Sequence, residues 1–210
     1  MPPATVDKAP CVPQDRRIAR SKRALRGALV QLMEERGFDN LSVNDLCERA
    51  DLTRATFYNH FHDKDELLLT LEDEVIADLE IFRVDLAHLS LLDLAVAVRT
   101  GQPLPLLVAL FDYLREQGDF LHAVLGPGGD IRFGPRLRDC VCTDLVWSIL
   151  HDRYRESTTS FVGYYVSFYA GAYLGVIMRW IETGMQESSE DMARIALRLF
   201  FIQPGESIVL

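Results

Sequence analysis

The chain has 210 residues, of which 49% are hydrophobic and 25% are charged, so it can bury a substantial core. Its 4 cysteines exclude a dense disulfide framework, and their spacing matches no zinc site. The net charge of −9 would ordinarily argue against a polyanionic partner, but the stretch 16–26 contains six basic residues and no acidic one. A basic segment on an acidic chain leaves nucleic-acid binding open.

The stretch 1–14 is predicted to be a disordered tail, because it contains four prolines and almost no large apolar side chain. It carries no apolar signal region, so we expect a cytoplasmic protein with reduced thiols. A helix is predicted over about 16–36, where Leu25, Leu29 and Leu32 recur on one face. Gly37 follows at the position where glycine commonly ends a helix.

Capping signals then predict two short helices and the start of a long one. Ser42 and Asp45 form a capping box that begins a helix ending near residue 50. Asp51 tolerates the left-handed backbone of a tight turn, and Thr53 can cap a further helix that ends near residue 61. A second capping box over 63–66 opens a helix that extends to about residue 88.

The rest of the chain also has helical rather than strand periodicity. The stretch 161–178 carries no charge, which is the length of a membrane span, and it contains Gly171 and Gly175 in the spacing of membrane helix dimers. Because tyrosines and glycines lower its hydropathy, we expect a helix buried on all sides rather than a membrane span. The predicted helices lie near 91–99, 103–117, 132–156, 160–184 and 189–202.

A family resemblance is carried by the run Thr53-Arg-Ala-Thr-Phe-Tyr-Asn-His-Phe-His-Asp-Lys-Asp-Glu-Leu67, together with the preceding Gly-Phe and Ser-Val-Asn-Asp-Leu. With these motifs, residues 16–69 resemble the DNA-binding head of the TetR/AcrR transcriptional regulators. One departure is Asp51, where the family usually has glycine. The resemblance implies an all-α fold: a three-helix helix-turn-helix DNA-binding domain, residues 15–65, followed by a helical effector-binding and dimerisation domain, residues 66–210.

The resemblance also implies which residues meet DNA. Arg54 is expected to bind a guanine edge with two hydrogen bonds. Ala55, Asn59 and Asn44 are further candidates for base contacts, and plain solvent exposure is the alternative for each. Phe57 is assigned to the core. The expected DNA-backbone set combines helix-start residues with the basic stripe: Ser42, Thr53, Thr56, Tyr58, His60, Lys64, Arg16, Arg17, Arg20 and Lys22.

Two of these assignments have specific arguments for or against them. Lys64 is a cation in the first turn of a helix, where it opposes the helix dipole, and a phosphate nearby would explain that choice. His60 has the alternative of packing at a helix end. The arginines and Lys22 of the basic stripe could follow the DNA backbone, enter the minor groove, or remain solvated.

In the second domain, the resemblance implies a cavity for a small apolar or aromatic effector. Phe111, Trp147, Tyr165 and Tyr169 could line it, although each could equally be an ordinary core aromatic residue. The family's last two helices form a dimer interface, in which Gly171 and Gly175 would permit close backbone approach. No cofactor and no metal site is expected, because the histidines and cysteines lack a ligand spacing.

The predicted function is a homodimeric transcriptional regulator that binds a pseudo-palindromic operator. Repression is the family's usual mode, with release by an effector and the helix beginning near residue 63 as the physical link. One alternative is a coactivator or interaction protein that works through a protein partner without operator binding. An all-α enzyme is the other, but the sequence shows no nucleophile–base pair, metal cluster or phosphate loop.

Overall fold

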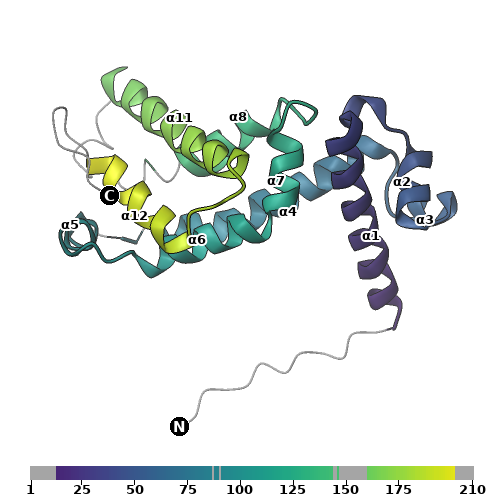
Figure 1. Ribbon diagram of the computed structural model, residues 1–210, viewed down its shortest axis with the longest axis horizontal. Coiled ribbons are helices and arrows are strands. Elements are labelled where there is room, and N and C mark those ends of the chain that lie inside the picture. The colour runs from purple at the N-terminus through teal and green to yellow at the C-terminus, as the bar shows by residue number, and fades with distance from the viewer. Residues whose placement is uncertain (1–12, 87, 90, 144–145, 147–159, 202–210) are drawn as a thin grey trace, which may run out of the picture. The chain divides into compact units, whose positions relative to one another are not determined.

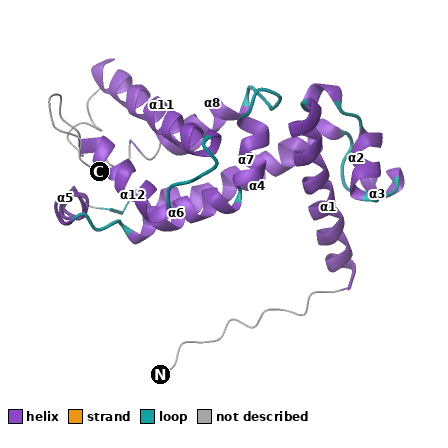
Figure 2. Ribbon diagram, viewed as in Figure 1, coloured by secondary structure: helices purple, strands orange, loops and turns teal. Residues whose placement is uncertain are grey.

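The computed structural model describes residues 13–86, 88–89, 91–143, 146 and 160–201. Within these ranges every regular element is a helix, as Figures 1 and 2 show, so the predicted all-α fold is confirmed. The chain divides into two compact units between Leu69 and Thr70. Each unit has its own buried side chains and is described by itself.

The first unit is built on a long helix and two short ones. The apolar stripe of α1 is buried at Leu25, Leu29 and Leu32, and α1 packs against α2. After α1 the backbone turns at Gly37, whose φ of 79° suits glycine and whose N–H donates to Met33 O at 2.8 Å. The elements are α1 (Pro13–Arg36), η1 (Phe38–Asn40), α2 (Val43–Ala50), α3 (Arg54–Tyr58) and the beginning of α4 (Lys64–Leu86).

The predicted caps of α2 and α3 are confirmed. The backbone N–H of Ser42 donates to Asp45 at 2.8 Å, while the Ser42 hydroxyl oxygen accepts from the Asp45 N–H at 3.3 Å. Asp51 ends α2 in the left-handed region, with φ 53° and ψ 48°. Thr53 accepts from the Thr56 N–H at 3.1 Å and starts α3. These local bonds set the turn between α2 and α3.

One bond of the second predicted capping box is seen at the start of α4. Asp63 accepts from the Glu66 N–H at 2.8 Å, as expected of an N-cap residue. The Glu66 carboxylate accepts from the His62 N–H, one position before the N-cap residue. α3 is also shorter than predicted, because it ends at Tyr58 rather than near residue 61.

The second unit is a bundle of helices. α12 packs against α6 and α5, and α11 packs against η2 and α7, as can be followed in Figure 1. α7 was not predicted. The expected helix over 132–156 begins at Phe133 but turns π-helical after Leu137, and most of its remainder lies outside the described residues. The elements after α4 are α5 (Leu91–Thr100), α6 (Pro105–Glu116), α7 (Gly118–Leu125), α8 (Phe133–Leu137), the π-helical turn η2 (Arg138–Thr143), α11 (Ser160–Glu182) and α12 (Ser189–Phe201).

The expectation that the helix over 160–184 is buried on all sides is wrong for the single chain. α11 buries one side, which includes Val166 and Ala170, while Phe161, Tyr164 and Phe168 on the other side are 71%, 77% and 69% exposed. Among the described residues, α11 packs against η2 and α7, and the three rings on its other side stay exposed. By length and composition alone α11 could also cross a membrane.

Candidate nucleic-acid interface

α3 has one buried anchor and several exposed polar neighbours. Phe57 is fully buried, and its ring meets that of Phe61 at 5.8 Å between centroids. Arg54 and Ala55 lie in the first turn of α3 and are exposed, and Asn59, which caps its C-terminal end, is exposed as well. Thus a single aromatic side chain fixes the helix while the predicted base-reading side chains remain accessible.

α2 is fixed to α1 by charged pairs. The Arg49 guanidinium donates two hydrogen bonds, of 2.7 and 2.8 Å, to the carboxylate of Glu35, and a third of 3.3 Å to Gln31. Arg36 lies 3.2 Å from Asp45. The hydrogen bonds from Arg49 lower the pKa of Glu35, and the Ser42 hydroxyl is the main cause of a lowered pKa at Asp45.

This pairing was not predicted from sequence. Arg49 and Glu35 are 14 positions apart and lie on different helices, so no local spacing rule identifies them. The two-bond geometry holds α2 in a defined orientation on α1. It therefore supports the surface on which Asn44, the fourth predicted base-contact residue, is exposed.

The predicted backbone-contact residues fall into two groups. Ser42 and Thr53 lie at the N-terminal ends of α2 and α3, where free N–H groups favour phosphate. Tyr58 is half exposed, with its ring edge-on to Phe57 at 5.5 Å, whereas Thr56 and His60 are partly buried and the His60 ring lies 6.3 Å from that of Phe61.

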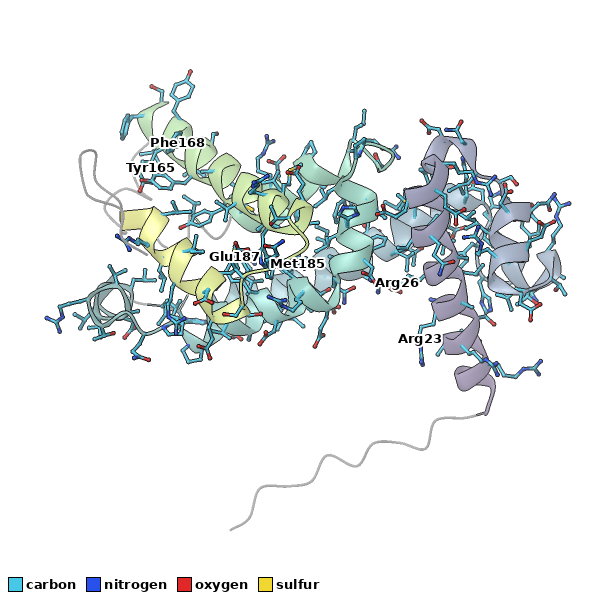
Figure 3. All side chains as sticks on the ribbon, viewed as in Figure 1. Arg23, Arg26, Tyr165, Phe168, Met185 and Glu187 are labelled. Atoms are coloured by element: carbon cyan, nitrogen blue, oxygen red, sulfur yellow. The ribbon has the colours of Figure 1, made fainter. Side chains whose placement is uncertain are left out.

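The second group lies on α1. Arg17 and Arg20 are exposed, which leaves their charge available to a polyanion. The Lys22 ammonium lies 5.9 Å from the centre of the Phe61 ring and is partly buried. Arg16 belongs to α1, but its side chain lies outside the described residues. Figure 3 shows two further arginines of α1, Arg23 and Arg26.

Lys64 makes contacts within the first unit that the sequence did not indicate. Its ammonium donates to Phe38 O at 3.0 Å, to Leu41 O at 3.0 Å and to Asp39 O at 3.3 Å. It also lies 4.6 Å from the centre of the Phe38 ring. An ammonium has three protons, and here each has a carbonyl acceptor within the first unit. These carbonyls supply negative potential to Lys64 from within the chain. The phosphate contact expected of Lys64 stays a prediction.

The predicted effector-pocket residues do not form one cluster. The rings of Tyr165 and Tyr169 are 4.6 Å apart and pack beside a small apolar core that includes Val162 and Val166. Burial is the main cause that raises the pKa of Tyr165 to about 12. Phe111 lies elsewhere in the second unit, edge-on to Trp180 at 5.5 Å.

Trp147 lies outside the described residues. A cavity of about 530 Å³ is present between α5 and α12, lined by residues that include Ala97, Val98 and Ile195. Of the described residues predicted to line a pocket, none borders it.

Gly171 and Gly175 lie on the exposed side of α11, in the same part of the helix surface as Phe168. A Cβ atom built at either glycine would meet nothing within 4 Å in the described structure. Figure 3 shows Phe168 and Tyr165 extending from α11. This side of α11 is therefore apolar, has no projecting side chain at the two glycines, and is not covered by the described parts of the chain.

A buried charged cluster in the second unit was also missed from sequence. The carboxylate of Glu72, 2% exposed, accepts a 2.8 Å hydrogen bond from Arg136, which also pairs with Asp73. The other oxygen of Glu72 has no partner among the described residues. Burial, and then the nearby charge of Asp130, raises the pKa of Glu72 to about 7.

Comparison with known proteins identifies the class. Residues 20–71 match the family described as bacterial regulatory proteins, tetR family, and residues 101–201 match the transcriptional regulator C-terminal region of the same family. Together the two matches span most of the chain. The chain belongs to the TetR family of transcriptional regulators and carries an N-terminal helix-turn-helix DNA-binding domain. The family consists of regulators rather than enzymes.

Individual relatives match this chain over only part of its length or at low sequence identity. The chain is 37% identical over 70 residues to the HTH-type transcriptional regulator EthR of Mycobacterium tuberculosis, a match that covers 31% of this chain and 32% of EthR. The fatty acid degradation regulator FadR of Bacillus halodurans has a similar fold, with a TM-score of 0.61 at 13% identity, covering 89% of this chain and 97% of FadR. The dihydroxyacetone kinase operon activator DhaS gives a TM-score of 0.55 at 20% identity, covering 85% and 93%.

Proposed function

We propose that this regulator is a homodimeric repressor whose α3 reads a pseudo-palindromic operator in the major groove. The observation that carries the proposal is α3 itself, which is anchored by the buried Phe57 while Arg54, Ala55 and Asn59 stay exposed. A helix held in this way can enter a groove without disturbing the core behind it. Two copies related by two-fold symmetry would place their α3 helices on half-sites one helical turn, or a multiple of it, apart.

The exposed side chains suit the major groove chemically. The guanidinium of Arg54 can donate to guanine O6 and N7 together, which is the commonest specific contact with DNA. The methyl group of Ala55 suits a thymine methyl, and the amide of Asn59 suits an adenine edge. Asn44 on α2 adds an exposed amide that can reach a base or a phosphate.

The phosphate contacts are assigned to the N-terminal ends of α2 and α3 and to α1. Helix N-termini favour anions because their free N–H groups and dipole point toward them. We assign these contacts to the following residues: Ser42, Thr53, Thr56, Tyr58, His60, Arg16, Arg17, Arg20 and Lys22. The exposed arginines of α1 would make binding strongly dependent on salt concentration.

The proposed dimer uses the uncovered side of α11. Phe161, Tyr164 and Phe168 supply aromatic surface, and Gly171 and Gly175 leave room for a second helix to approach closely. A two-fold dimer would bring the same side of α11 from each copy together and remove these rings from water. A soluble dimer of this kind belongs in the cytoplasm, which is the location we propose.

An effector is proposed to act through the second unit. The paired rings of Tyr165 and Tyr169 offer a surface for a small apolar or aromatic molecule. Such a ligand would release DNA by favouring one of two pre-existing arrangements of the dimer. α4 is the physical link in this proposal, because it begins in the first unit and continues in the second.

Operator selection tests the DNA-binding proposal. We expect the protein to enrich an inverted repeat from random duplex DNA, and the Arg54→Ala variant to lose information at one mirrored base position. The physical reason is the loss of a two-bond guanine contact, which is worth about 1–3 kcal/mol of discrimination. Arg99→Ala, which removes an exposed arginine of α5, is the matched control and should select the same repeat as the wild type.

The opposite result would favour the alternative function. If the wild-type protein enriches no sequence at moderate salt, the chain acts as a coactivator or interaction protein through a protein partner.

A further inference from the structure

Lys64 lies at a position where the dipole of its own helix disfavours a positive charge. It is the first residue of α4, and the N-terminal end of a helix carries partial positive charge. A cation at that position costs free energy unless negative potential is supplied from outside the helix. The structure supplies this potential from the segment that joins α1 to α2.

The carbonyl groups around Lys64 form a defined cradle. Phe38 O and Leu41 O lie 3.0 Å from its ammonium nitrogen, and Asp39 O lies 3.3 Å away. These carbonyls belong to η1 and the residue after it, where a helical turn ends and its carbonyl oxygens carry partial negative charge. The Phe38 ring below the ammonium, at 4.6 Å, adds a cation–π contact.

The cradle joins two parts of the first unit that are distant in sequence. Leu41 immediately precedes Ser42, the N-cap of α2, so the carbonyls held by Lys64 lie at the entry to that helix. The backbone bonds within η1 are long, at 3.4 Å for both Asn40 N–H to Gly37 O and Leu41 N–H to Phe38 O. The ammonium of Lys64 shares one of these acceptors, Phe38 O, and adds bonds to Asp39 O and Leu41 O. Charge-assisted bonds of this kind are stronger than the backbone bonds within η1 and fix the turn.

We propose that Lys64 is a positioning residue for DNA binding, which holds the start of α2 against the start of α4 and makes no phosphate contact. The inference rests on the proposed DNA-binding function. In this role Lys64 shapes the surface that reads DNA, and its three N–H donors are occupied by backbone carbonyls of the chain. A lysine suits this task better than an arginine, because three protons on one nitrogen can point to three carbonyls, whereas a guanidinium is a planar fork.

The salt dependence of DNA binding separates positioning from phosphate contact. In Lys64→Met, the apolar stem is kept and the three donors are lost. We expect weaker binding to all sequences, a lower Tm, and faster amide hydrogen exchange over residues 38–46, with the slope of log K against log salt unchanged from wild type. A phosphate contact would instead make the slope shallower by about 1. Arg20→Gln, an exposed cation proposed to contact phosphate, is the comparison in which the slope should fall while Tm stays the same.

A second variant keeps the test valid if Lys64→Met folds poorly. Lys64→Arg keeps the positive charge but cannot satisfy the three carbonyls in the same way, so we expect a lower Tm and weaker binding at an unchanged slope. Wild-type Tm and affinity in Lys64→Arg, or a shallower slope in Lys64→Met, would overturn the inference. If the wild-type protein binds no DNA, the proposed function fails, but Tm and hydrogen exchange still report whether Lys64 holds the turn.

Discussion

At the scale of single residues, Glu72 is a buried carboxyl group among the described residues of the second unit. Its carboxylate is 2% exposed, with Arg136 on one oxygen and no described partner on the other. The ion pair with Arg136 should lower the pKa, but desolvation and Asp130 outweigh it and raise the pKa to about 7. The folded protein therefore retains a proton on Glu72 over a pH range where the unfolded chain has lost it.

This raised pKa predicts the sign of a pH effect on stability. Between pH 4.5, the ordinary value, and pH 7 the folded state binds more protons, so the free energy of unfolding falls as pH rises through this window. In Glu72→Gln this pH-dependent contribution, on the order of 3 kcal/mol for a pKa raised from 4.5 to about 7, should disappear. Urea unfolding at several pH values measures it, with Glu74→Gln as an exposed control on the same helix. Parallel pH curves for wild type and Glu72→Gln would contradict the assignment.

Residues whose partners are near in sequence could be predicted, and residues whose partners are distant could not. The capping bonds of Ser42 and Thr53 span three positions, so a motif contains both donor and acceptor. The acceptors of Lys64 lie more than 20 positions earlier. A lysine with an unexplained position was visible in the sequence, but the carbonyl groups that explain it carry no sequence signal.

At the scale of elements, the hydrophobicity of α11 predicts that the helix is covered but not which chain covers it. Its uncharged length predicts burial, but the sequence does not say whether the covering surface belongs to the same chain or to a second copy. Within the described chain one side is covered, and Phe161, Tyr164 and Phe168 remain exposed on the other. The helices with clear caps, α2 and α3, were predicted, whereas α7 was missed because no capping motif of this kind marks its start.

The uncovered side of α11 predicts how the oligomeric state responds to charge. Phe168→Glu would place a carboxylate in the proposed interface, where losing its water is costly, and we expect a monomer in sedimentation velocity. Ala77→Glu adds the same charge at an exposed position of α4, away from α11, and should remain a dimer. A dimer that persists unchanged in Phe168→Glu would exclude this side of α11 as the interface.

At the scale of the whole molecule, charge and function are divided between the two parts of the chain. Residues 1–65 hold 11 Lys/Arg and 10 Asp/Glu, whereas residues 66–210 hold 11 and 21. The acidic second part resists non-specific attraction to DNA, so that contact is directed to the helix-turn-helix unit. The sequence indicated this division and the family, since both follow from local motifs and composition. The arrangement of the effector site depends on packing between distant helices and could not be derived in the same way.

Methylation interference on the selected operator tests the central claim most directly. Guanine N7 lies in the major groove, where we propose that Arg54 of each copy binds. We expect N7 methylation to block binding at mirror-related guanines about 34 Å apart, or at a multiple of that spacing, and Arg54→Ala to remove this sensitivity. Wild-type binding that is indifferent to N7 methylation, or blocked in only one half of the repeat, would contradict the claim that a two-fold dimer reads DNA through α3.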